Sequence, residues 1–131
     1  IGDQCLGSGC NRFPPGIAET KERLENRPVK YGLVLHAEEA AIINAVRNGQ
    51  SVVGSTIYCP WAACRECAKK IIAHGISRLV IHKACKLTGD QHWREEREAG
   101  LAMLAEAGVA VDSVSVHDGP QLRRNGVLWK S

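Results

Sequence analysis

The sequence predicts an α/β domain of three layers, in which a mixed central sheet is enclosed between helices. Segments rich in β-branched residues alternate with segments of helical periodicity, which is typical of α/β folds. The 131 residues are 44% hydrophobic, which is enough for one compact core. Neither a repeat nor a linker interrupts the chain, so residues 1–131 are expected to form a single domain.

The expected strands and helices alternate along the chain. In order, they are a strand at 4–10, a helix at 36–47, a strand at 51–58, a helix at 64–73, a strand at 78–82, a helix at 90–107 and a strand at 109–116. The tail, 121–130, could add a last strand or a surface cover. Residues 11–28 are expected to form a loop, because Pro14-Pro15 and the following glycine break regular structure and the charged run 19–27 allows only a short turn.

Each expected element has a local signal. Gly7 and Gly9 in the first strand allow a ligand or a neighbouring backbone to come close. In the first helix, Ala40, Ile43 and Val46 recur near helical spacing. The second strand is rich in β-branched residues, a glycine closes the second helix, and the strand at the end of the series alternates apolar and polar side chains.

Two short motifs have the most specific chemistry. His36 and Glu38 belong to H-A-E, and Cys64 and Cys67 to C-R-E-C. An imidazole and two thiolates are ligands that Zn²⁺ prefers, and three protein ligands leave a fourth position for water, as in catalytic sites. Glu38 is close enough to His36 to move protons to and from that water. The motifs therefore predict a zinc hydrolase.

The choice of thiol ligands has an alternative. Cys64 and Cys67 are three residues apart and would share one face of a helix, whereas Cys59 would lie before that helix in a strand. We therefore favour the first pair over a site in which Cys59 replaces one of them. The other interpretations are a buried, hydrogen-bonded His36 with a structural or redox cysteine pair, and a zinc-stabilised interaction module with a fourth protein ligand.

Both halves of the predicted site lie at the start of an expected helix. Backbone N–H groups and the helix dipole favour negative charge there, so they are expected to lower the pKa of Cys64 and Cys67 and to stabilise their thiolates. The ligands can converge only if the two helices lie side by side. Two parallel strand–helix units would supply that arrangement.

Composition and charge exclude several classes of protein. A formal charge of +3 is too small to indicate a nucleic-acid partner. No apolar run has membrane-spanning length, and no signal peptide is visible. The six cysteines surround a metal motif instead of forming a disulfide framework, which favours a cytoplasmic location. Cys5, Cys10 and Cys85 are expected to be buried or unreactive, with a second metal site at Cys10 as an alternative.

The two motifs resemble the H-x-E and C-x-x-C signature of the cytidine and deoxycytidylate deaminase family. Further segments carry the same resemblance: G-S-G-C-N-R-F-P at 7–14, K-Y at 30–31, S-T-I-Y at 55–58, A-K-K at 68–70 and G-I at 75–76. The similarity is close over roughly residues 7–82. It departs from the family at Ala63, where relatives usually carry proline; here the nearby proline is Pro60. Relatives also carry a helix and a strand before the segment at 4–10, so we expect the sequence to lack the start of the protein.

The resemblance implies a zinc-dependent hydrolase that deaminates dCMP to dUMP and releases ammonia, with Glu38 as the proton shuttle. The alternatives are deamination of a free cytidine or deoxycytidine nucleoside or base, and of adenosine in transfer RNA. The loop at 11–14 and Lys30-Tyr31 favour the nucleotide, and the weak positive charge argues against transfer RNA. The resemblance also implies a homo-oligomer, a dimer or a hexamer.

The resemblance also implies contacts with the substrate. Asn11 would hydrogen-bond the sugar, and the backbone at Ala37 and at Ala62-Ala63 would contact the edge of the base. Trp61 lies just before the cysteine helix, where its ring could pack on the base or the sugar. An ordinary core tryptophan is an equally good interpretation.

The phosphate contact rests on weaker signals. Arg12 is a candidate for the 5′-phosphate, although a single arginine in a loop is usually only solvated. Arg123 and Arg124 in the tail are weaker candidates still. The remaining histidines and two glutamates of the motif region are expected to be surface or packing residues: His74, His82, His92, His117, Glu39 and Glu66.

Overall fold

A computed structural model describes residues 4–82, 91–114 and 125–130. The strands are β1 (Gln4–Cys10), β2 (Thr56–Tyr58), β3 (Arg78–His82), β4 (Ala110–Val114) and β5 (Asn125–Lys130). The helices are α1 (Lys21–Glu25), α2 (Arg27–Leu33), α3 (Ala37–Arg47), α4 (Arg65–Ala73) and α5 (Gln91–Glu106). Four residues named above lie outside the described residues: Cys85, His117, Arg123 and Arg124. No helix in the described ranges is both long and apolar enough to cross a membrane.

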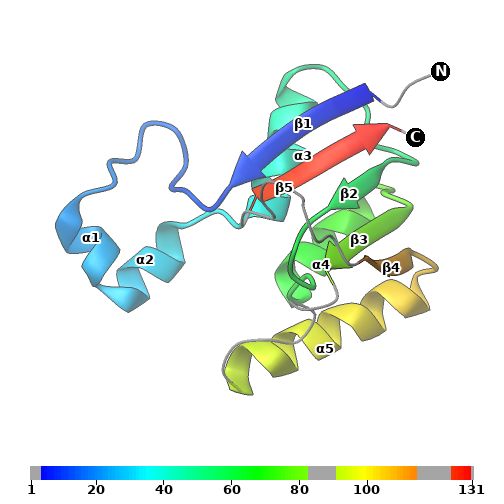
Figure 1. The fold of residues 1–131 in the computed structure, drawn as a ribbon. Helices are drawn as coiled ribbons and strands as arrows, with labels where there is room; N and C mark the ends of the chain where they lie inside the picture. The colour runs from blue at the N-terminus through cyan, green and yellow to red at the C-terminus, as the bar shows by residue number, and fades with distance from the viewer. Residues whose placement is uncertain (1–3, 83–90, 115–124, 131) are drawn as a thin grey trace.

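The five strands form one mixed sheet in the order β1-β5-β2-β3-β4 (Figure 1). The strands β2, β3 and β4 are parallel, and β5 is antiparallel to both of its neighbours, β1 and β2. The predicted α/β class and mixed sheet are therefore confirmed. The tail of the chain supplies a strand, and this strand lies inside the sheet between two strands that are more than 40 residues apart in sequence.

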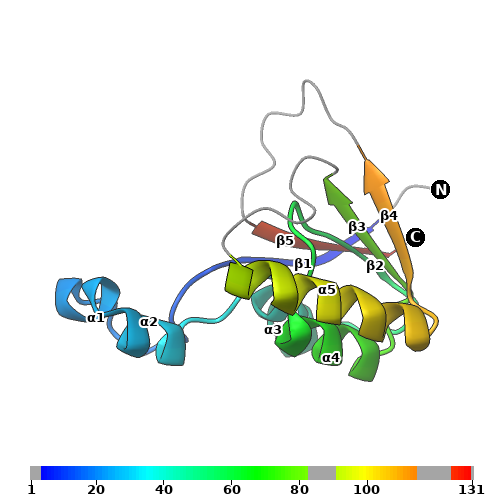
Figure 2. The ribbon, with the colours of Figure 1, turned by 90° about the horizontal axis from the view of Figure 1, so that it is seen from below.

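The strand order also places the helices. Because β1 and β2 are both antiparallel to β5, they run in the same direction, so the connections through α3, α4 and α5 all step the same way across the sheet. Right-handed crossovers that step in one direction put their helices on one face. Figure 2 shows α3, α4 and α5 together on that face, so in the described residues these three helices and the sheet form two layers, where three were expected.

The buried face of α3 differs from the predicted one. Ile43 is 38% exposed and Val46 is 50% exposed, and the helix instead buries Ala37, Glu38, Ala41, Ile42 and Ala45. The glycines of β1 explain the choice: a Cβ on Gly7 would lie 2.8 Å from the backbone nitrogen of Ala45, and one on Gly9 would lie 2.6 Å from that of Ala41. The sheet backbone approaches α3 so closely that only its alanine face fits.

Two other expectations were wrong in part. The loop at 11–28 contains α1 and runs into α2, whose first turn accommodates Pro28 because a proline there breaks no helical hydrogen bond. The strand expected at 51–58 is reduced to β2, because Ser55 donates its N–H to the carbonyl of Val52 in a tight turn. Val53 in that turn is 75% exposed.

We call residues 18–33, which include α1 and α2, the arm. It projects from the rest of the described chain (Figure 1), and neither of its helices buries a residue. The N-termini of its helices are capped by nearby side chains: Thr20 accepts a hydrogen bond from the backbone N–H of Arg23, and Asn26 accepts one from that of Val29. The remainder, which we call the body, contains the sheet, α3, α4, α5 and the hydrophobic core.

Candidate metal centre and substrate cavity

His36, Cys64 and Cys67 converge where α3 and α4 begin. His36 and Cys64 are the N-cap residues of these helices, and Cys67 lies one turn into α4. The Nδ1 atom of His36 is 3.3 Å from Sγ of Cys67 and 3.4 Å from Sγ of Cys64. A tetrahedral zinc ion would separate a nitrogen and a sulfur ligand by about 3.5 Å. The three side chains can therefore hold a metal ion, and their donor set fits Zn²⁺.

The protonation of this group follows from its close contacts. The pKa of Cys64 is lowered to about 4, first by its hydrogen bond with the Cys67 thiol and then by its hydrogen bond with His36. The pKa of Cys67 is raised, because it shares a proton with Cys64 and is buried. The pKa of His36 is raised by the Cys64 sulfur. The predicted lowering of the pKa thus applies to Cys64 alone. A second negative charge, on Cys67, is disfavoured until a cation lies between the two sulfurs.

Glu39 joins the two halves of the site. One carboxylate oxygen accepts the backbone N–H of His36 at 3.0 Å, and the other pairs with Lys70 of α4 at 3.0 Å. Burial by itself would lower the pKa of Lys70, but the hydrogen bond with Glu39 and the negative charges of Glu39, Cys67 and Glu66 together outweigh it, so that pKa is raised. The expectation of a solvated Glu39 was therefore wrong, since its side chain is only 14% exposed. The other helix glutamate, Glu66, is exposed as expected.

Glu38 is a buried acid, and the Cys59 thiol lies beside its carboxylate. The Cys59 thiol donates a hydrogen bond to Oε1 of Glu38 at 3.1 Å. Within the described residues, the metal-holding group contains neither Cys59 nor a fourth side chain beyond His36, Cys64 and Cys67. The geometry thus favours the cysteine pair of α4 as ligands, and it offers no support in the described ranges for a closed, purely structural zinc site.

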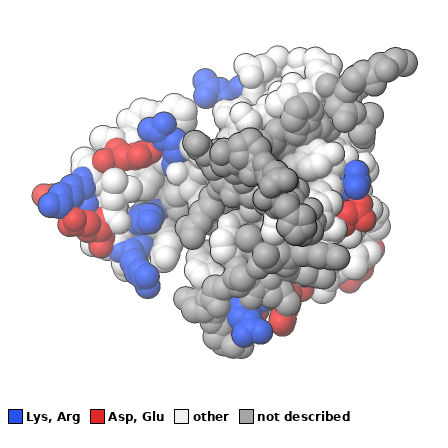
Figure 3. All heavy atoms as spheres, in the orientation of Figure 1, with Lys and Arg blue, Asp and Glu red and all other residues white. Residues whose placement is uncertain are grey.

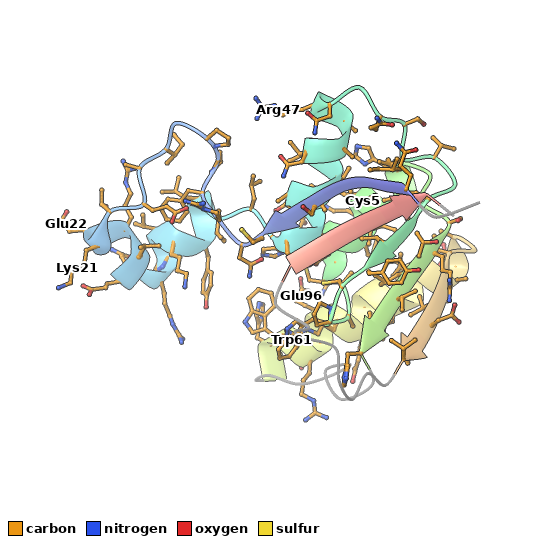
Figure 4. The ribbon with its side chains drawn as sticks, turned by 45° about the horizontal axis from the view of Figure 1, so that its top comes forward. Cys5, Lys21, Glu22, Arg47, Trp61 and Glu96 are labelled. Carbon is orange, nitrogen blue, oxygen red and sulfur yellow. The ribbon has the colours of Figure 1, made fainter. Side chains whose placement is uncertain are left out.

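A cavity of about 730 Å³ lies beside the ligands, within the size range of small-molecule sites. His36, Glu38 and Cys64 line it from the body, and Lys30 and Tyr31 line it from the arm. In Figure 4, Trp61 and Glu96 lie on the body, whereas Lys21 and Glu22 mark the far end of the arm. The cavity is therefore bounded by both regions.

Two of the predicted contacts for sugar and base join β1 to α3. Asn11 accepts the backbone N–H of Ala37 through Oδ1 at 2.7 Å, and both residues line the cavity. Because Asn11 occupies that N–H, the contact of Ala37 with a base stays a prediction. Ala62 lines the cavity, but Ala63 is fully buried and is absent from the lining formed by the described residues.

Arg12 and Trp61 both reach the cavity. Arg12 is exposed and pairs with Glu19 at 3.1 Å, so a phosphate there would compete with a carboxylate. Trp61 is half-buried, and the guanidinium carbon of Arg97 lies 4.7 Å from the centre of its ring. Trp61 therefore lies in the cavity wall, and its contact with a base or a sugar stays a prediction.

Two residues of α5 in the cavity wall were not predicted from sequence. Trp93 packs edge-to-face against the rings of His36 and Tyr31, with centroids 6.1 and 6.2 Å apart. Arg97 lies one turn further along the same face. Their spacing of four residues was the available signal, because such residues are neighbours on a helix. The spacing alone does not indicate which face meets the cavity.

Gly100 continues this face of α5 and sets its position. A Cβ at Gly100 would overlap the carbonyl oxygen of Ala63. An ion pair between Arg65 and Glu96, with an N–O distance of 2.6 Å, further ties α5 to α4. The close approach of α5 to the start of α4 thus brings Trp93 and Arg97 to the metal centre.

The remaining described cysteines are free thiols. Cys5 is exposed, so of the two expectations for it, burial or a lack of reactivity, only the second stays a prediction; Cys10 is half-buried at the cavity edge. No second group of metal ligands that includes Cys10 occurs among residues 4–82, 91–114 and 125–130. A second metal site therefore has no support in this part of the chain.

Comparison with known families gives a match over most of the site. Residues 2–83 match the model of the cytidine and deoxycytidylate deaminase zinc-binding region. An uncharacterized deaminase from the luxG 3′ region of Aliivibrio fischeri is 34% identical over 111 residues, which are 83% of this chain and 71% of that protein.

Deoxycytidylate deaminases are also among the relatives. The one from Mus musculus is 32% identical over 82% of this chain and 59% of its own length. The one from Enterobacteria phage T4 is 48% identical over 74% of this chain and 44% of its own length. The chain thus spans less than two thirds of these two relatives.

A solved structure has the same fold. The apo dCMP deaminase of cyanophage S-TIM5 matches with a TM-score of 0.61 and 22% identity, over 82% of this chain and 70% of that one. The same enzyme in complex with dCMP and dUMP matches with a TM-score of 0.57. At this level of identity, the likeness supports the fold.

Proposed function

The chain belongs to the cytidine and deoxycytidylate deaminase family, and from that premise we propose that it hydrolyses dCMP to dUMP and ammonia. The observation that carries the proposal is the convergence of three zinc-type ligand atoms beside the buried carboxylate of Glu38, at the wall of a cavity. In this proposal His36, Cys64 and Cys67 hold the zinc, and Glu38 moves the protons.

The chemistry divides between the metal and Glu38. Zinc, when bound, would lower the pKa of a water molecule towards neutrality. Glu38 accepts a proton from the attacking water and delivers it to ring N3 while oxygen bonds to C4. It then carries the second proton to the amine at C4, which leaves as ammonia. A single carboxylate suits both transfers because it accepts and releases a proton in turn.

The charges of the cavity support a nucleotide substrate. Four cations line it, Arg12, Arg27, Lys30 and Arg97, whereas its acids are Glu19 and Glu38. Figure 3 shows the mixed charges of the arm beside the body. The cationic side chains of the lining therefore outnumber its acidic side chains. A 5′-phosphate would reduce this excess, and an uncharged nucleoside would not.

An ammonia-release assay on zinc-loaded protein tests the proposal. It compares dCMP, dCTP, deoxycytidine and cytidine at matched concentrations, with Glu38→Gln as the control for contaminating deaminases. Preference for dCMP is the expected result. Equal rates on dCMP and deoxycytidine would replace it with a nucleoside deaminase, and no turnover of any of the four by zinc-loaded protein would refute it.

A homo-oligomer, a dimer or a hexamer, and a cytoplasmic location are also part of the proposal. Exposed apolar side chains on the arm support self-association, among them Leu24 and Val29, at 41% and 40% exposure. Analytical ultracentrifugation measures the state directly, and a monomer at micromolar concentration would contradict the expected oligomer.

A further inference from the structure

Cys59 is the first residue after β2, and its backbone is fixed by the sheet. Its N–H donates to the carbonyl oxygen of Val80 in β3 at 2.9 Å, which continues the pairing of the two strands. The side chain is only 4% exposed. The sulfur therefore occupies a fixed position, set by strand pairing and burial instead of by a flexible loop.

The contact of this sulfur is specific. Glu38 lies on α3, 21 residues earlier in the chain, and its Oε1 is 3.1 Å from Sγ of Cys59. Burial raises the pKa of the Cys59 thiol, and the negative charge of Glu38 raises it further. The sulfur thus keeps its proton and acts as the donor of the hydrogen bond.

We propose that Cys59 is a positioning residue, which holds Oε1 of Glu38 and so directs Oε2 towards the reacting water and ring N3. The inference rests on the proposed function, in which Glu38 carries both protons. A long glutamate side chain has several rotatable bonds, and each productive proton transfer needs one oxygen in a narrow range of positions. A donor fixed by the sheet restricts that freedom before substrate binds.

Two simpler roles of Cys59 make different predictions. If Cys59 were only a packing residue, serine would be no better than alanine, because both lose the volume of sulfur. If Cys59 held the metal, its removal would release zinc. The positioning role instead predicts that a hydroxyl, which also donates a hydrogen bond, preserves function.

The test compares Cys59→Ala and Cys59→Ser with the unaltered protein, using dCMP turnover and zinc content. Cys59→Ala is expected to lower kcat by about 10–100-fold, to change KM by less than about threefold and to keep one zinc per chain, because only orientation in the transition state is lost. Cys59→Ser is expected to recover most of kcat. Cys5→Ala, at an exposed thiol, is the matched control and should leave kcat unchanged.

A double-mutant cycle assigns the effect to Glu38. In the Glu38→Gln background, Cys59→Ala should cost much less than it does alone, because the group it positions is already disabled. An unchanged kcat in Cys59→Ala, an equal loss in Cys59→Ser, or zinc release would each overturn the proposal. An equal loss of kcat from Cys59→Ala in the unaltered protein and in the Glu38→Gln background would also overturn the proposal.

A structural measurement keeps the inference separate from the proposed function. Crystal structures of zinc-loaded protein and of Cys59→Ala should show the Glu38 carboxylate displaced or split between rotamers in the variant. An unmoved carboxylate would refute the positioning role even if the protein proves inactive on dCMP. Inactivity of the unaltered protein would count against the proposed function alone.

Discussion

The cavity has two unlike sides, one formed by the body and one by the arm. On the body side, Glu38 of α3 and Cys67 of α4 are buried, and Glu39 and Lys70 connect the two helices. On the arm side, α1 and α2 bury no residue, although Lys30 and Tyr31 face the same cavity. The candidate ligands and the proposed proton carrier thus lie where backbone and side chains are held by several contacts, whereas the arm offers only surface contacts.

This difference follows from what each side must do. A metal site and a proton carrier tolerate displacements of only a fraction of an ångström, so they need supporting contacts. Contacts with the part of a substrate far from the reacting atom tolerate more movement. We therefore expect substitutions on the body side to affect catalysis and stability together, and substitutions on the arm to affect binding alone.

The largest expected effect is at the proton carrier. Glu38→Gln should lower dCMP turnover by roughly 10²–10⁴-fold, because the amide cannot accept a proton. Zinc content, measured by mass spectrometry, should stay at one per chain, since His36, Cys64 and Cys67 are unaltered. Substantial residual activity in this variant would remove Glu38 from its role.

Two glycine substitutions, one on each side, compare how much the body and the arm contribute to stability. Gly100→Ala should lower the free energy of unfolding by about 1–3 kcal/mol, because its Cβ would collide with the Ala63 carbonyl. Gly32→Ala in α2 meets no atom within 4 Å and should be neutral or stabilising by up to about 1 kcal/mol, through helix propensity. Urea denaturation measures both, and a similar loss for the two variants would contradict the contrast between arm and body.

A pair of glutamates sharpens the comparison at the metal centre. Glu39→Ala should weaken zinc binding by about 10–100-fold, because it removes the link between His36 and Lys70. Glu66→Ala, which removes only exposed ion pairs of α4, should leave the zinc affinity unchanged. Competition with a chromogenic chelator measures the affinities, and equal values would mean that the link does not organise the site.

The smallest effect is expected on the arm. Tyr31→Ala should raise KM for dCMP by about two- to fivefold, because one half-exposed aromatic contact with the cavity and with Trp93 is lost. The free energy of unfolding and kcat should not change, since Tyr31 is exposed. A drop in kcat as large as that of Cys59→Ala would show that the arm also orders the chemistry.

Local sequence patterns predicted the helices and strands best where residues close together in the chain determine the bounds of the element. The strand at 4–10 and the strand at 78–82 have the predicted bounds. The buried face of α3 was mispredicted, because the glycines of β1 draw its alanine face against the sheet, and no periodicity within the helix contains that information. The helix α2 was missed, because the charged residues and Pro28 suggested a loop although proline suits a first helical turn.

The sequence alone predicted the candidate ligands, since a spacing of three residues puts Cys64 and Cys67 on one helix face and only a few residue types bind zinc. Only the tertiary structure decided the place of β5 inside the sheet, the thiol that meets Glu38 and the residues of α5 that reach the cavity. These features depend on contacts between residues far apart in the chain, and such contacts leave no local periodicity to read.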